Sequence, residues 1–272
     1  MRSFLLTFSG AILLTFRRCS TVSQAVACNM LLAFFPMLLL VLALLNLTTG
    51  PLTAQPEVIR WIRLTLPPGS SQVVVDFLSR PDPHPWRWAL LGLSGFLLAG
   101  TQALHLLMDG FRQITGTHER PPFWSRQFRA LFLLLLTIVP WLATVVLTVF
   151  GNQARAWVGA RYGLIWSIRV LWGGLLLTLI LVMAMLVIAV LYRASQRGFG
   201  SWRGVLPGAA VATLLWWAAN SAFGVYVRRV PYSLAYGGLA AAIGLLIWMQ
   251  LTTVVVFIGA AFNALRTSSI RA

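Results

Sequence analysis

The sequence contains no lysine and only five acidic residues. All 21 basic side chains are arginines, and they leave the chain with a formal net charge of +16. Charged residues make up 10% of the chain and hydrophobic residues 59%, whereas a soluble domain carries roughly 25% charged residues. The scarcity of charge excludes an ordinary soluble domain and predicts a protein embedded in a membrane.

Cysteine and histidine are scarce as well, with two and three residues. Metal clusters need more ligands at closer spacing, so we expect no metal site and no cofactor. The few acids also fall on both sides of a long hydrophobic run and cannot share one site across a bilayer, so we expect no enzyme. These acids are Glu57, Asp76 and Asp82 before that run, and Asp109 and Glu119 after it.

Long hydrophobic runs are abundant, and they set the predicted fold class. Several are long enough for a membrane-spanning helix. We predict an all-α, polytopic membrane protein: a bundle of six transmembrane helices in a single domain, 1–272. The predicted spans cover residues 25–47, 88–108, 130–150, 170–192, 205–227 and 237–265.

Two segments outside the spans are predicted to lie on the membrane surface. Residues 4–16 are apolar, but Arg17 and Arg18 follow the apolar stretch, whereas a signal peptide carries its charge in front. An N-terminal amphipathic helix fits better. Residues 50–85 are more polar and rich in proline, which predicts an outer loop with short interfacial helices.

The arginines stand between the hydrophobic runs in ones, twos and threes rather than in one patch. This distribution is typical of loops that face anionic lipid headgroups, and it argues against a nucleic-acid partner. Six spans place both termini on the same side. More arginines fall on that side than on the other, which favours cytoplasmic termini.

An ordered set of short motifs resembles the YihY/virulence factor BrkB family of bacterial inner-membrane proteins, and the resemblance covers nearly the whole chain. It includes the proline motif of the first span, the loop after the second span, and the ends of the fourth to sixth spans. The motifs are Ala33-Phe34-Phe35-Pro36, Glu119-Arg120-Pro121 with Phe123-Trp124 and Arg126, Leu191-Tyr192-Arg193, Pro207-Gly208-Ala209-Ala210, Tyr236-Gly237-Gly238-Leu239 and Gly259-Ala260-Ala261-Phe262-Asn263-Ala264.

The resemblance implies a six-span protein of the bacterial cytoplasmic membrane. Some members carry the name ribonuclease BN, and others are linked to serum resistance or envelope lipid transport. It implies transport or translocation of an envelope lipid or small solute. The alternative function is a non-transporting scaffold or partner subunit of envelope lipid machinery. A membrane-bound hydrolase or ribonuclease is the weakest of the three hypotheses. The expected partners are membrane lipids, a second copy of the chain or envelope lipid-transport proteins. The family often has a glutamate where this chain has Ala261, which weakens any mechanism that uses that carboxylate to carry protons.

Polar side chains within or next to the spans are the candidate site. A polar group in hydrocarbon costs free energy unless it is paired or faces water. These residues therefore either line a substrate path or form interhelical hydrogen bonds. His105 and Asp109 lie one helical turn apart, with Arg112 placed to neutralise Asp109. The substrate-path candidates are Gln102, His105, Asp109, Asn220, Tyr226, Tyr236, Gln250 and Asn263.

A second group surrounds the last predicted outer loop. Arg228, Arg229 and Tyr232 are candidates for binding phosphate or lipid headgroups, and the alternative is simple anchoring at the interface. Small residues spaced four apart, such as Gly204 with Gly208, predict close helix packing.

Overall fold

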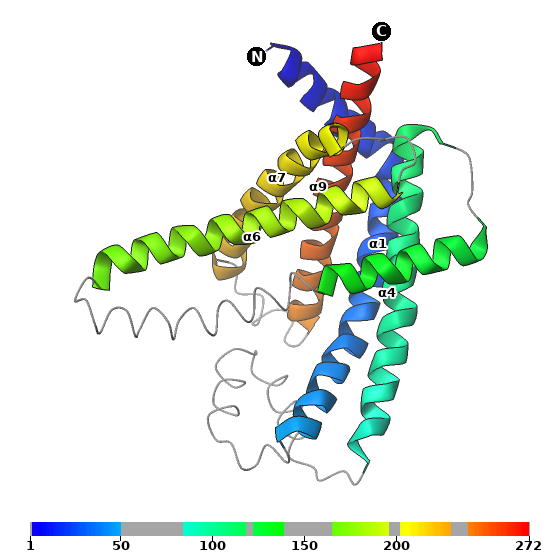
Figure 1. The fold of residues 1–272 in the computed structure, drawn as a ribbon, viewed down its shortest axis with the longest axis vertical. Coiled ribbons are helices and arrows are strands. Elements are labelled where there is room, and N and C mark those ends of the chain that lie inside the picture. Colours follow the sequence, from blue (N-terminus) through cyan, green and yellow to red (C-terminus); the bar gives the residue numbers. More distant parts are fainter. Residues whose placement is uncertain are drawn as a thin grey trace. The chain divides into compact units, whose positions relative to one another are not determined.

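A computed structural model of the chain describes residues 2–49, 84–117, 122–138, 165–195, 202–229 and 239–271. Every regular element within these ranges is a helix, and none is a strand (Figure 1). Helices suit a chain this apolar because they satisfy their backbone hydrogen bonds internally, which lipid cannot do. The predicted all-helical class is therefore confirmed for the part of the chain that the structure describes.

The described helices follow the hydrophobic runs and extend beyond them. α4 begins at Pro85, the kind of first-turn position that tolerates a residue without an N–H. The helices are α1 (Arg2–Thr49), α4 (Pro85–Thr115), a helix at 123–138, α6 (Ile165–Ser195), α7 (Trp202–Arg229) and α9 (Leu239–Arg271).

Five of these helices are long and apolar enough to cross a membrane: α1, α4, α6, α7 and α9. They contain the first, second, fourth and fifth predicted spans and most of the sixth. The surface helix predicted at 4–16 is joined to the first span in one uninterrupted helix, α1. The third predicted span, 130–150, is described only to residue 138, and the first outer loop lies outside the described residues except for its last two positions.

The chain divides into two compact units. Unit 1 contains Met1–Ser23, Leu104–Ala219 and Thr252–Ala272, and unit 2 contains Gln24–Ala103 and Asn220–Leu251. Four helices (α1, α4, α7 and α9) contribute residues to both units. The expected single domain therefore stays a prediction, and each unit is described by itself.

The core of unit 1 is an aromatic cluster contributed by three helices. Phe111 of α4, Tyr192 of α6 and Phe257 of α9 are fully buried. The Phe111 ring meets the other two edge to face, with centroids 5.3 Å from Tyr192 and 5.6 Å from Phe257. The Tyr192 hydroxyl donates to the Val256 carbonyl at 2.6 Å. These contacts fix the last turns of α4 against α6 and α9.

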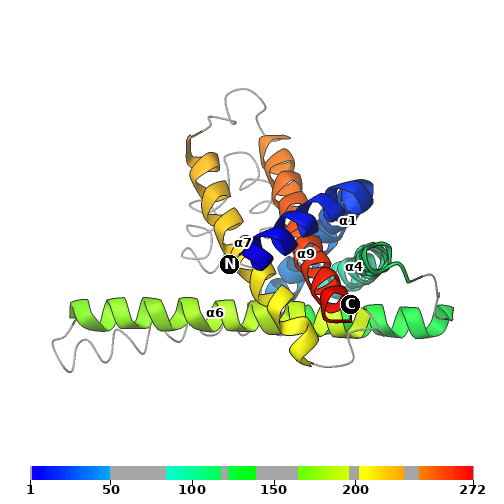
Figure 2. The same ribbon diagram turned by 90° about the horizontal axis from the view of Figure 1, so that it is seen from above.

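α7 and α9 approach closely in unit 1 because two glycines face each other. A methyl group on Gly259 would lie 2.5 Å from the Gly208 carbonyl oxygen. Asn263, which is 1% exposed, accepts from the Gly208 N–H at 2.7 Å and donates to the Val205 carbonyl at 3.0 Å. Elsewhere in this unit α1 crosses α9 where Gly10 meets Leu265 (Figure 2).

Unit 2 is held by an analogous close approach of α1 and α4. A methyl group on Gly92 would lie 2.7 Å from the backbone nitrogen of Leu40, and one on Gly95 would lie 3.0 Å from the ring of Pro36. Small residues let the helix backbones come together, and the Pro36 ring fills the space beside Gly95.

Candidate functional site

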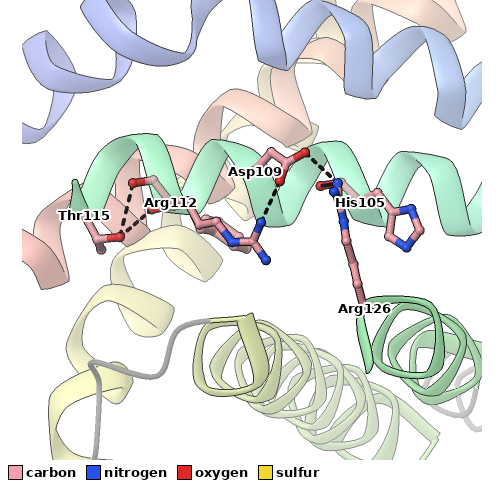
Figure 3. Close-up of polar contacts among 6 residues, drawn as sticks. His105, Asp109, Arg112, Thr115 and Arg126 are labelled. Atoms are coloured by element: carbon pink, nitrogen blue, oxygen red, sulfur yellow. Dashed lines mark hydrogen bonds and ion pairs between the residues drawn. The ribbon is translucent and has the colours of Figure 1, made fainter. Parts of the chain in front are cut away.

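An aspartate between two arginines marks the end of α4 in unit 1. Arg112 Nη1 donates to Asp109 Oδ1 at 3.0 Å, and Arg126 Nη2 donates to Asp109 Oδ2 at 2.6 Å (Figure 3). Arg126 also reaches the His105 carbonyl oxygen at 3.5 Å. We call His105, Asp109, Arg112 and Arg126 the Asp109 cluster. It joins α4 to the helix at 123–138.

α4 ends in a glycine turn close to the cluster. Gly116 has a positive φ of 69°, and Thr117 N–H donates to the Arg112 carbonyl at 3.2 Å. This is the hydrogen-bond pattern of a glycine-terminated helix end. Arg18 of α1 donates to the Gln113 carbonyl at 3.0 Å. Its positive charge therefore lies at the negative, C-terminal end of the α4 dipole, where a cation is stabilising.

The helix at 123–138 has two different faces. Ala130, Leu133 and Leu134 are buried in unit 1, whereas Trp124 and Phe128 are more than half exposed. Phe123 and Phe132 are exposed as well. Arg126 leaves this helix toward Asp109. Exposed aromatic rings beside arginine are typical of the membrane–water interface.

The Asp109 cluster is only partly shielded from its surroundings. The side chains of Arg112, Arg126 and Asp109 are 14%, 25% and 36% exposed. Two arginine side chains face one carboxylate in this cluster. Arg126 Nε and His105 Nε2 are buried, and neither has a hydrogen-bond partner among the described residues. Such unsatisfied groups call for a physical explanation.

Arg112 pairs with Asp109, as their spacing on α4 predicts, whereas the assignment of His105 and Asp109 to a substrate path stays a prediction. Gln102 is exposed on α4. In unit 1 the Asn263 amide is hydrogen-bonded to the α7 backbone. In unit 2 the Asn220 side-chain oxygen accepts from Trp248 Nε1 at 2.6 Å. Gln250 is half-buried on α9, and Tyr226 is exposed at the end of α7.

The remaining predicted positions lie outside what the structure describes. Tyr232 and Tyr236 fall between the described ranges, as do the side chains of Arg228 and Arg229. The role of this last outer loop in binding headgroups therefore stays a prediction.

Sequence reasoning missed Arg126 as the second partner of Asp109. The two residues are separated by 17 positions. The available signal was local: Gly116 and Pro122 mark the boundary between two helices, and Arg126 falls in the first turn of the second. The aromatic cluster around Phe111 was also missed, because its three members come from three separate helices.

Within the described ranges, no three histidine, cysteine, aspartate or glutamate side chains gather to hold a metal ion. Both cysteines are free thiols. Cys19 is buried, and its Sγ lies 3.6 Å from the Gly110 carbonyl oxygen beside the cluster.

Comparison with known proteins gives one consistent family. The family model described as virulence factor BrkB matches residues 14–272. A ribonuclease-like protein of Bacillus subtilis, YfkH, is 25% identical over 89% of this chain and 88% of its own length. A UPF0761 membrane protein of Tolumonas auensis is 33% identical over 49% of this chain and 43% of its own. Another, from Aromatoleum aromaticum, is 26% identical over 97% of this chain and 63% of its own. No solved structure matches the chain.

Proposed function

This chain belongs to the virulence factor BrkB family, and on that premise we propose that it moves an envelope lipid or small solute across the bacterial inner membrane. In this proposal the chain has six spans, and the third, 130–150, begins within the helix at 123–138. Both termini lie in the cytoplasm. Its partners are membrane lipids, a second copy of the chain or envelope lipid-transport proteins, and the chain itself catalyses no reaction.

The observation that carries the proposal is the Asp109 cluster. Asp109 and Arg112 lie within α4, a helix apolar enough to span a membrane. Charged groups at such positions are costly and by default mark a substrate or ion pathway. A purely structural pair would be complete with one arginine, but this aspartate has two. Two arginines beside one carboxylate suit a substrate with an anionic group.

Reconstitution tests the proposal. The purified chain is placed in liposomes that carry a fluorescent anionic phospholipid in both leaflets, and a membrane-impermeant quencher removes the outer signal. Protein that moves lipid makes the inner pool accessible over time. A matched flux assay with a radiolabelled organophosphate covers small solutes. If protein-containing and protein-free liposomes behave alike in both assays, transport by this chain alone is refuted.

The alternative, a scaffold or partner subunit, also has an observation in its favour. Asn263 and Asn220 were candidates for a polar path, yet both amides bond to other parts of the protein. Internal amides that are paired in this way need no aqueous path. The scaffold hypothesis predicts no flux in liposomes and a stable complex with envelope lipid machinery on detergent extraction from cells.

The spans and termini are tested separately. Reporter fusions that are active only in the cytoplasm or only outside it, placed after residues 121 and 160 and at both ends, should report cytoplasm, outside, cytoplasm and cytoplasm. Opposite signals at the two termini would contradict an even number of spans.

The name of the Bacillus relative adds a third hypothesis, RNA cleavage. It predicts hydrolysis of RNA by the purified chain that a variant lacking both Asp109 and His105 loses.

A further inference from the structure

We propose that residues 2–23 of α1 form a helical arm that lies along the surface of the bilayer and binds anionic lipid there. We call this segment the N-terminal arm. Its apolar face enters the leaflet, and Arg17 beside that face contacts the lipid phosphates. The proposal goes beyond the proposed function: the position of the arm is measured without any flux, so its failure and the failure of transport are separate results.

The apolar stretch of α1 is too long for one membrane span. It runs from Leu5 to Leu44, 40 residues, about 60 Å at the helical rise. The hydrocarbon core is about 30 Å thick and takes about 20 helical residues. Arg17 and Arg18 divide the stretch, and the part after them includes the predicted span 25–47. The part before them is therefore the one that leaves the core.

The contacts of the arm within unit 1 lie at the ends of two candidate spans. Gly10 meets Leu265, two residues before the apolar stretch of α9 ends at Thr267. Arg18 donates to the Gln113 carbonyl, two residues before the end of α4. Gly10 and Arg18 are eight residues apart, about 12 Å along the helix, and Figure 2 shows the arm crossing α9 rather than running alongside it. A helix that crosses spanning helices near their ends lies at the membrane surface.

One side of the arm is buried by the protein. Its members recur every four residues, as positions on one helix face do, and each is at most 2% exposed: Ala11, Thr15 and Cys19. The Thr15 hydroxyl donates to the Ala11 carbonyl at 2.8 Å, and Cys19 Sγ lies 3.6 Å from the Gly110 carbonyl oxygen of α4. This side holds the arm to unit 1 and leaves the opposite side open to a partner.

The opposite side of the arm is apolar and exposed. Leu6, Leu13 and Phe16 are 72%, 60% and 58% exposed, and their spacing of seven and three residues places them on one helix face. Ser9 lies between them, and its hydroxyl donates to the Leu6 carbonyl at 3.1 Å, which satisfies the hydroxyl without water. Large apolar side chains gathered on one exposed face mark an interaction surface.

A lipid surface fits this face better than a second copy of the chain. The arm contains three arginines and no acidic residue, so two arms paired with each other would repel. Arg17 is exposed beside the apolar face. Leucine and phenylalanine in the acyl boundary, with arginine at the anionic headgroups, are the pattern of helices that lie in the membrane interface. The arm is also continuous with a candidate span, which keeps it at the membrane.

The test measures the depth of the arm in a bilayer. The full chain carries Cys28→Ala, which leaves only the buried Cys19, and receives one nitroxide label through Leu6→Cys, Leu13→Cys or Phe16→Cys. In liposomes of phosphatidylcholine and phosphatidylglycerol, electron paramagnetic resonance compares collisions with oxygen and with a water-soluble nickel chelate. All three labels should lie at one depth, about 5–10 Å into the boundary between headgroups and acyl chains.

Other positions of the arm give different results. A spanning helix predicts that the labels at residues 6 and 13 differ in depth by about 10 Å. A label that meets the nickel chelate as freely as a label in water places the arm in solution. Few collisions with either reagent, together with dipolar broadening between labels, indicate a second copy. Each of these three results overturns the proposal.

A charge on the apolar face tests the same assignment. Leu13→Glu should release the arm, so that the Phe16→Cys label becomes accessible to the nickel chelate. Thr21→Glu is the matched control: it adds the same charge at an exposed position that helical spacing places on the other side of Arg17 from the apolar face. The label should keep its depth in that variant. An equal response to the two glutamates overturns the proposal.

The preference for anionic lipid is tested at Arg17. A fluorophore replaces the nitroxide of the Leu13→Cys chain, and its quenching by spin-labelled phosphatidylglycerol is compared with quenching by spin-labelled phosphatidylcholine. An arginine near a membrane surface contributes about 1 kcal/mol toward anionic lipid, about fivefold. Arg17→Gln should therefore lower the local enrichment of phosphatidylglycerol about fivefold.

Arg203→Gln is the matched control for this charge. It removes the same charge from an exposed arginine of α7 in unit 1, and the enrichment beside residue 13 should stay at the value of the chain with Arg17 and Arg203 intact. Equal enrichment in the Arg17 and Arg203 variants overturns the proposal, as does the absence of any preference for phosphatidylglycerol when both arginines are present.

Discussion

Replacing Gly259 with alanine tests the packing that holds unit 1 together. The added methyl group would lie 2.5 Å from the Gly208 carbonyl oxygen, 2.5 Å from the Tyr192 hydroxyl and 2.7 Å from the Ala212 Cβ. Comfortable contacts between heavy atoms are about 3.5–4.0 Å. Two of the three obstacles are a backbone atom and a Cβ, which cannot rotate away. α7 and α9 must therefore separate, or Tyr192 must move.

The expected cost follows from these two responses. Inserting a methyl group into a packed core typically costs about 1–3 kcal/mol. Displacing Tyr192 also breaks its hydrogen bond to the Val256 carbonyl, worth about 0.5–1.5 kcal/mol. The free energy of unfolding should fall by about 2–4 kcal/mol.

The measurement is unfolding of the purified variant in mixed micelles with increasing sodium dodecyl sulfate, followed by far-ultraviolet circular dichroism. Gly244→Ala is the matched control on the same helix, because a methyl group there meets nothing within 4 Å. That variant should be unchanged or stabilised by up to about 1 kcal/mol, the helix-propensity gain of alanine over glycine. If Gly259→Ala is as stable as Gly244→Ala, the close approach of α7 and α9 is refuted.

Three further substitutions probe other contacts by the same unfolding measurement. Asn263→Leu removes both hydrogen bonds to the α7 backbone and should cost about 1–3 kcal/mol; a neutral result would mean that these bonds are not formed. Gly110→Ala forces a methyl group against the Phe257 ring and should cost about 1–3 kcal/mol, with the wild-type value contradicting that contact. Trp248→Phe loses the hydrogen bond to Asn220, worth about 0.6 kcal/mol, so a loss several times larger would indicate a wider role for the indole.

Features encoded within one helix were predictable from the sequence. Spacing alone places His105, Asp109 and Arg112 on successive turns of α4, because positions three or four apart share a helix face. The hydrophobic runs predict the helices, because lipid excludes other backbone conformations from a span. The boundaries were less predictable, since the described helices continue past the apolar residues into polar turns.

Features that depend on which helix faces meet were not predictable. Gly208 and Gly244 stand in the same small-residue spacing, yet only Gly208 is crowded by a neighbouring helix. Arg126 reaches Asp109 from another helix, 17 positions along the chain, which no spacing within one helix indicates. Asn263 was equally compatible with a polar path and with a helix–helix bond, since either one removes the cost of a buried amide. Only the position of α7 next to α9 distinguishes the two.

The most direct test of the account is lipid flux through proteoliposomes containing equal amounts of the Arg126→Gln or the Arg203→Gln variant. The two substitutions remove the same charge, but only the first alters the Asp109 cluster. The account predicts that translocation of fluorescent phosphatidylglycerol by the Arg126 variant falls about tenfold, while the Arg203 variant matches the unaltered chain. Equal flux through both variants would contradict the assignment of the Asp109 cluster as the functional site.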